Sequence, residues 1–178
     1  MTKGKQYPEV TCGRCGACCS IPLVPVTHKD LGRLVSFTGK KASDIVRFSS
    51  PAEMDYDSES GLWIRFRYGK RAMVLKKKEE RCVFLSSERS CLAYQARPRT
   101  CRTFPYCVLK DENGKREVTL NRIVDCRARK CSGVDFKALF AEVAKENRED
   151  EEYERIVSRW NGSGASGGTR EFLSYLGF

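Results

Sequence analysis

The sequence has very little histidine, and it lacks any long apolar run. His28 is the only histidine, so a Cys–His nucleophile pair has little support. No apolar stretch approaches the ~20 residues that a membrane span needs. No glycine-rich phosphate loop or dinucleotide fingerprint is present. The opening residues MTKGKQYPEV lack the apolar segment of a secretory signal, so we expect a cytoplasmic protein with no membrane segment.

Ten cysteines in a chain of 178 residues are the most unusual feature of the composition. Disulfides rarely persist in a reducing compartment, whereas bonds between thiolates and metals do. A secreted disulfide framework would need the export signal that the N-terminus lacks. The composition therefore predicts metal ligation, within a chain whose 40% hydrophobic content suits one domain with a modest core.

The residue patterns predict an α+β fold. Residues 27–40 are typical of a helix that begins after Thr27 and ends at Gly39, and SDIVRF suggests a second short helix. LWIRFRY and RAMVLKKK predict one β-hairpin, and YCVLKDENGKREVTL predicts another with its turn at Asn113-Gly114. We expect a small, cysteine-rich, metal-stabilised domain with short β-hairpins and peripheral helices.

The character of the chain changes at Val134, where apolar residues begin to follow helical spacing. The segment KENREDEE is polar all round, which indicates either a solvated helix or a break. TREFLSYLGF is typical of a short amphipathic helix that packs on the rest. We therefore expect a cysteine-cluster domain over residues 1–133 and a C-terminal helical extension over residues 134–178, packed on it.

The spacing of the cysteines indicates which kind of metal group they could bind. A C-x₂-C pair forms a tight turn that directs two sulfurs inward, and structural zinc sites usually take two such pairs. Iron–sulfur proteins instead use C-x₂-C-x₂-C with a distant fourth cysteine. TCGRCGACCS contains the iron–sulfur-like triple, which favours that cofactor, although thiolate sites suit either metal. The cysteines form three groups: Cys12, Cys15, Cys18 and Cys19; Cys82, Cys91, Cys101 and Cys107; Cys126 and Cys131.

The adjacent pair Cys18 and Cys19 suggests two centres. In an extended backbone neighbouring side chains point to opposite sides, so two corners of one tetrahedron would be hard to fill. The simpler arrangement sends one thiolate to each of two nearby metal centres. The alternative is a single centre with one of the two cysteines left as a spectator.

CGRCGACC followed by CVFLSSERSCLAYQARPRTCRTFP resembles the CxxCxxCC cysteine-cluster family (YkgJ-type), described as a zinc- or iron-chelating domain. The match runs from Cys12 to about Pro105 and extends to Cys126. The resemblance implies eight ligand cysteines, enough for two four-thiolate sites, and leaves the roles of Cys107 and Cys131 open. These ligands are Cys12, Cys15, Cys18, Cys19, Cys82, Cys91, Cys101 and Cys126.

Three arginines crowd Cys101 in the segment RPRTCR: Arg97, Arg99 and Arg102. The favoured interpretation is that their guanidinium groups surround the metal, balance thiolate charge and hydrogen-bond to sulfur. The alternative is an anion-binding fork for a substrate carboxylate or phosphate. On the favoured interpretation, the nearby aromatic residues form the dry lining around the metal.

We therefore expect a metal-binding protein that holds one or two all-cysteine centres, either 4Fe–4S iron–sulfur clusters or zinc, for electron transfer or metal handling. Flagellin lysine N-methylases carry a similar cysteine domain, so the resemblance allows a related enzyme, but no separate cofactor motif supports it. A net charge of +10 motivates a zinc-stabilised nucleic-acid module as a further alternative. The basic runs lack interleaved aromatics, so nucleic acid is not an expected partner; a protein partner is left open.

Overall fold

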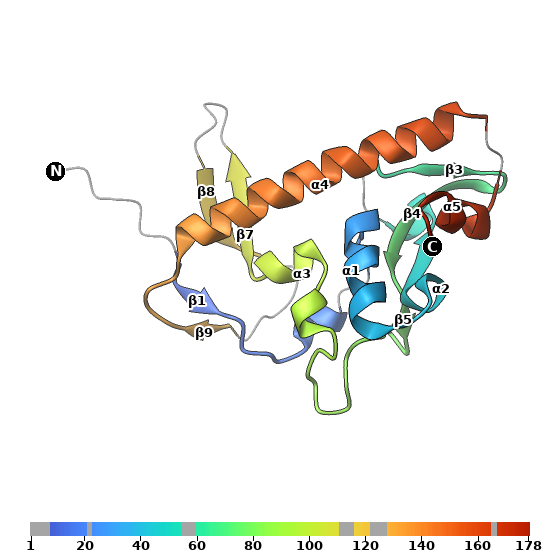
Figure 1. Ribbon diagram of the computed structural model, residues 1–178. Coiled ribbons are helices and arrows are strands. Elements are labelled where there is room, and N and C mark those ends of the chain that lie inside the picture. The colour runs from blue at the N-terminus through green and yellow to red at the C-terminus, as the bar shows by residue number, and fades with distance from the viewer. Residues whose placement is uncertain (1–7, 21–22, 55–59, 111–115, 122–127, 165–166) are drawn as a thin grey trace.

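A computed structural model describes residues 8–20, 23–54, 60–110, 116–121, 128–164 and 167–178 (Figure 1). The α-helices in these ranges are α1 His28–Thr38, α2 Ala42–Ile45, α3 Arg99–Thr103, α4 Phe136–Gly162 and α5 Thr169–Tyr175. The strands are β1 Val10–Thr11, β2 Val46–Ser49, β3 Ile64–Phe66, β4 Gly69–Leu75, β5 Lys77–Lys78, β6 Arg81–Cys82, β7 Tyr106–Lys110, β8 Arg116–Leu120 and β9 Arg129–Lys130. Short 3₁₀ helices are η1 Ala17–Ser20, η2 Pro51–Glu53 and η3 Tyr94–Ala96. The architecture is α+β, as predicted.

Helix α1 begins and ends where its sequence predicts. Thr27 is the N-cap and forms a capping box with Asp30, while Gly39 adopts a left-handed conformation with φ of 66° at the C-cap. The expectation of a helix over the whole of SDIVRF is wrong beyond Ile45. Val46 starts β2, whose β-branched and aromatic residues pair with β4 instead of continuing the helical turn.

The largest sheet is antiparallel with strand order β2-β4-β3. The β3–β4 hairpin confirms the first predicted hairpin, with Ile64 opposite Arg71. The β7–β8 pair confirms the second, with Cys107 opposite Thr119, although its expected turn at Asn113-Gly114 lies outside the described residues. Two further pairs, β1–β9 and β5–β6, are only two residues long.

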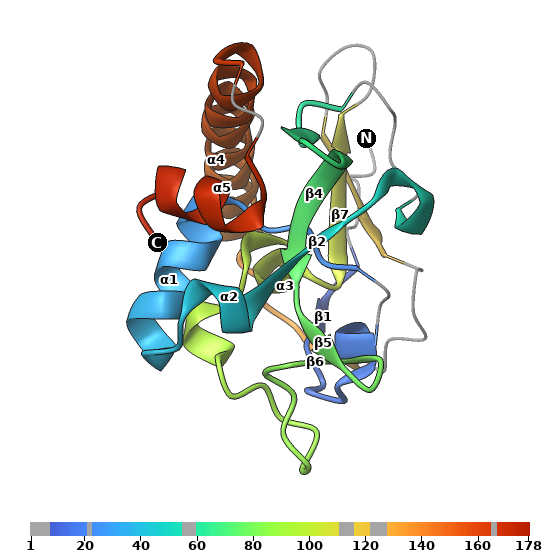
Figure 2. The same ribbon diagram turned by 90° about the vertical axis from the view of Figure 1, so that its right-hand side faces the viewer.

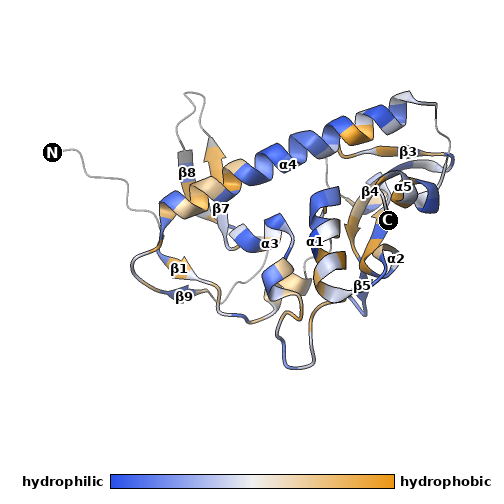
Figure 3. Ribbon diagram, viewed as in Figure 1, coloured by the Kyte–Doolittle hydropathy of each residue, from blue (hydrophilic) through white to orange (hydrophobic). Residues whose placement is uncertain are grey.

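Helix α4 is continuous from Phe136 to Gly162, so the polar segment KENREDEE is helical and not a break. It is only partly solvated, since Glu149 is buried and pairs with Arg33 of α1. Figure 3 shows this middle part of α4 as hydrophilic, and Figure 2 shows α1, α4 and α5 on one side of β4. Towards its end, α4 buries Tyr153, Val157 and Trp160 in the same core as α1 and the central sheet. The division of the chain into domains at residues 133 and 134 stays a prediction.

The core also fixes the C-terminal helix. Phe172 of α5 is fully buried, and its ring lies 5.2 Å from that of Trp160 and 5.9 Å from that of Phe66. Edge-to-face aromatic pairs of this kind add stability beyond the apolar area that they bury. Within the described ranges, no helix has the combination of length and apolar character that crossing a bilayer requires.

Candidate metal centre

The first four cysteines lie on a loop that is bent twice by left-handed residues. Arg14 has φ of 51° and Gly16 has φ of 73°. The Arg14 backbone N–H donates a hydrogen bond to Cys12 Sγ at 3.4 Å. A Cβ atom at Gly16 would lie 3.2 Å from Leu85, so the glycine allows this loop to pack against the loop after β6. The loop then enters η1, which carries Cys18 and Cys19.

The second group of cysteines comes from the segment between β6 and α3. Cys82 is the last residue of β6, and Cys91 pairs with Leu85 in an isolated bridge. Cys101 lies in the short helix α3, whose N-terminus is anchored because Asp30 of α1 accepts a hydrogen bond from the Arg99 backbone N–H at 2.9 Å. These contacts bring residues far apart in the sequence to the same side of the molecule.

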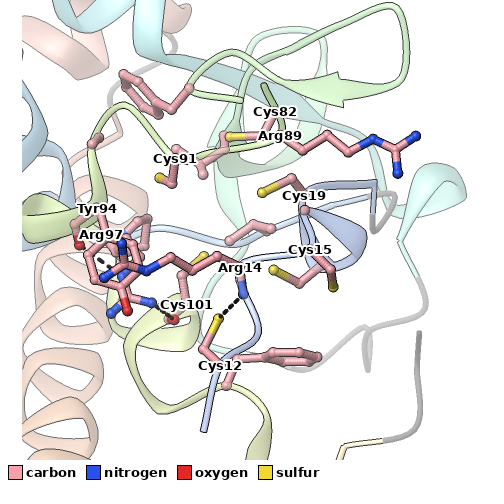
Figure 4. Close-up of a pocket in the computed structure, with 18 of the residues that line it drawn as sticks. Cys12, Arg14, Cys15, Cys19, Cys82, Arg89, Cys91, Tyr94, Arg97 and Cys101 are labelled. Carbon is pink, nitrogen blue, oxygen red and sulfur yellow. Dashed lines mark hydrogen bonds between the residues drawn. The ribbon is translucent and has the colours of Figure 1, made fainter. Parts of the chain in front are cut away.

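Seven cysteines line a single cavity of about 70 Å³, which we call the cysteine cavity (Figure 4). Apolar side chains of Val24, Leu75 and Phe84 close its inner wall. Cys107, in β7, and Cys131, after β9, do not line it. The eighth expected ligand, Cys126, lies outside the described residues. The seven are Cys12, Cys15, Cys18, Cys19, Cys82, Cys91 and Cys101.

Four of these thiols, which we call the inner group, each interact electrostatically with the other three: Cys18, Cys82, Cys91 and Cys101. Cys19 also interacts with three of them. Burial is the largest factor that raises the pKa of the last three. In addition, every one of the six pairs within the group is close enough for one thiolate to raise the pKa of the other. Four thiols that each disfavour the ionisation of the others need a cation among them to be ionised together.

The expectation that Cys18 and Cys19 lie on an extended backbone and point to opposite sides is wrong. Both residues are in the 3₁₀ helix η1, both line the cysteine cavity, and their side chains hydrogen-bond to each other. This hydrogen bond lowers the pKa of Cys18 to about 7 and is the largest factor that raises the pKa of Cys19. Cys18 is therefore the thiol of the pair that ionises first.

The three arginines near Cys101 point in different directions. Arg97 lines the cysteine cavity, and its charge lowers the pKa of Cys18 and Cys91. Arg99 instead forms ion pairs with Asp30 and Asp150, away from the cavity.

Arg102 also points away from the cysteine cavity, because its Nε lies 2.6 Å from Oε1 of Glu142 on α4. The cavity is lined instead by two arginines that the sequence did not single out, Arg14 and Arg89. Both have left-handed backbones, with φ of 51° and 60°. Arginine is uncommon in this conformation, so no local pattern predicted their place.

The arrangement bears on which metal group could be held. In a tetrahedral zinc site, Zn–S bonds of about 2.3 Å place the sulfurs within roughly 3.8 Å of one another. Among the described residues, no three Cys, His, Asp or Glu side chains are gathered closely enough to hold one ion. Among the described residues, the seven thiols line a cavity and do not converge on one point.

The CxxCxxCC family, described as a putative zinc- or iron-chelating domain, matches residues 11–153. The chain belongs to this family. The matched range includes the whole cysteine cavity and continues past residue 133 into α4. No curated protein and no solved structure matches the chain. Membership confirms the family that the cysteine spacing predicted and supports binding of zinc or iron, without distinguishing between them.

Proposed function

We propose that the cysteine cavity holds an iron–sulfur cluster, with Cys18, Cys82, Cys91 and Cys101 as its ligands, and that the protein serves electron transfer. The observation that carries the proposal is a single cavity lined by seven cysteine side chains, these four among them. When bound, such a cluster accepts and donates single electrons.

The size of the cavity favours a cluster over a single zinc ion. Its volume of about 70 Å³ is several times the ~10–15 Å³ that one water molecule requires on the same measure. The alternative is zinc held by the same residues, and the test must distinguish it from an iron–sulfur cluster.

The remaining residues of the cavity have supporting roles in this proposal. The guanidinium of Arg97 offsets thiolate charge, and the buried walls formed by Leu75 and Phe84 limit the access of water. Charge, hydrogen bonds to sulfur and solvent exposure set the reduction potential of a cluster. Cys12, Cys15, Cys19 and Cys126 are the other four of the eight cysteines that the family resemblance implies, and the resemblance leaves their grouping open. A second centre and a cytoplasmic location stay predictions.

The proposal is tested by purifying the protein without oxygen and measuring iron, acid-labile sulfide and zinc in the same sample. We expect a brown protein with broad visible absorbance and iron and sulfide in equal amounts. Reduction with dithionite should partly bleach the absorbance, and reoxidation with a limited amount of oxidant should restore it, as reversible redox activity requires. A colourless protein with stoichiometric zinc, obtained from cells supplied with iron, would overturn the iron–sulfur assignment and leave metal binding intact.

A further inference from the structure

Tyr94 carries two arginine guanidinium groups on its ring. The Arg97 guanidinium carbon lies 3.7 Å from the ring centroid, and that of Arg14 lies 4.5 Å from it. Figure 4 shows both side chains reaching the ring from different segments, at the edge of the cysteine cavity. Two like charges on one ring repel each other, and a single ring offsets this only in part.

Neither guanidinium has a carboxylate partner among the described residues. Arg97 Nε donates to the Tyr94 carbonyl and its Nη1 to the Cys101 carbonyl, so Nη2 remains without a hydrogen bond in the described part of the chain. Within the same ranges, the guanidinium of Arg14 makes no hydrogen bond at all; the residue's one bond to a side chain comes from its backbone N–H.

Two other arginines of this part of the molecule pair with carboxylates, whereas Arg89 of the cysteine cavity forms no ion pair among the described residues. Arg33 pairs with Asp30 and Glu149, and Arg102 pairs with Glu142. The pair on Tyr94 is thus a concentration of positive charge with free donors, held in place by the fold. Arg14 also adopts a left-handed backbone there, which is unfavourable for a residue with a Cβ atom.

A groove begins at this ring and leads away from the cysteine cavity. Tyr94 and Arg97 line both, whereas Arg14 lines the cysteine cavity beside them. The groove, which we call the side groove, continues past Arg102, Phe104, Tyr106 and Leu139 with a volume of about 500 Å³. This volume is in the range of small-molecule sites, which are apolar with a few placed polar groups. No acidic side chain lines the groove among the described residues.

We infer that Arg14 and Arg97 bind the oxyanion group, a carboxylate or a phosphate, of a small organic ligand whose apolar part lies in the side groove. Guanidinium groups recognise both oxyanions through paired N–H donors. Both guanidinium groups lie against the Tyr94 ring at the start of the groove, and its aromatic walls accept an apolar body. The inference goes beyond the proposed function and does not depend on which metal the cysteines hold.

The test measures binding of phenyl phosphate, phenylacetate and inorganic phosphate to the metal-loaded protein by isothermal titration calorimetry. We expect phenyl phosphate or phenylacetate to bind, with the preferred one identifying the oxyanion, and inorganic phosphate to bind more weakly because it leaves the groove empty. Benzyl alcohol, which has the ring without the charge, should not bind. Failure of both aromatic anions to bind would overturn the inference.

Variants show whether the two arginines bind a ligand or only balance the charge of the thiolates. Arg14→Gly removes the guanidinium while suiting the left-handed backbone, and Arg97→Gln removes the second charge; each should weaken binding at least about tenfold. Arg71→Gln is the matched control, because Arg71 stacks on Tyr68 at 5.2 Å elsewhere in the molecule. Unchanged affinity in Arg14→Gly, or equal loss in the control, would contradict the site. Metal content measured in each variant tests the cysteine site separately.

Discussion

At the scale of single residues, Gly16 is the point where the first cysteine loop touches the second. Its φ of 73° and the 3.2 Å approach of a Cβ atom to Leu85 both disfavour any other residue. Gly16→Ala should therefore cost about 2 kcal/mol of unfolding free energy and lower the metal content, because folding and binding energies are shared in such sites.

Gly133 provides the control for this substitution. It has a similar φ of 76°, but a Cβ atom there would meet nothing within 4 Å. Gly133→Ala should cost about 1 kcal/mol, from backbone conformation alone, and leave the metal content unchanged. If the contact with Leu85 were unimportant, urea titrations of the two variants would show equal losses of unfolding free energy.

Glu146 is a partly buried carboxyl on α4 whose environment disfavours its charged form. Burial raises its pKa from 4.5 to about 7, against the opposing charges of Arg99 and Arg102 and together with the like charge of Glu142. Because the folded state holds the proton more tightly than the unfolded state, this group makes the protein less stable as pH rises from about 4.5 to 7.

Glu146→Gln removes this effect. After allowance for partial exposure, we expect the gain in unfolding free energy to be larger at pH 8 than at pH 5 by about 1 kcal/mol. Glu151→Gln, at an exposed position of the same helix, should change little at either pH. Equal gains from Glu146→Gln at both values would show that its protonation is not coupled to folding.

At the scale of elements, Asp30 joins α1 to the helix that carries Cys101. It is fully buried, caps α1 through Thr27, pairs with Arg33, and accepts the backbone N–H of Arg99. Asp30→Ala would leave these donors without a partner, so we expect a loss of about 3–5 kcal/mol in unfolding free energy. Asp44→Ala, at the exposed start of α2, should stay within about 0.5 kcal/mol. Similar stability of the two variants would refute the role of Asp30.

The elements themselves were largely predictable, because their signals are local. The Thr27 cap, the Gly39 stop and the alternation in β3 and β4 each depend on a few adjacent residues. The backbone at Cys18 and Cys19 was not predictable in this way, since a 3₁₀ turn and an extended run are both compatible with ACCS. The directions of Arg99 and Arg102 depend on carboxylates from α1 and α4, which are distant in the sequence.

At the scale of the whole molecule, the cysteine cavity forms because the N-terminal loop, the segment after β4 and α3 meet beside α1. The family resemblance identified the same set of thiols that line it, apart from Cys126, which lies outside the described residues; the groups drawn from spacing alone also contained Cys107 and Cys131. Which four lie closest together follows from tertiary packing, so spacing alone left the grouping open. The positions of Arg14 and Arg89 also depend on how these segments meet.

The most direct test of the account compares two cysteine variants of the anaerobically purified protein. Cys91 belongs to the inner group of thiols, whereas Cys107 lies in β7 and does not line the cavity. We predict that Cys91→Ser loses most of its iron, sulfide and visible absorbance, while Cys107→Ser keeps the wild-type content. Full metal content in Cys91→Ser, or an equal loss in Cys107→Ser, would contradict the assignment of the cluster to the cysteine cavity.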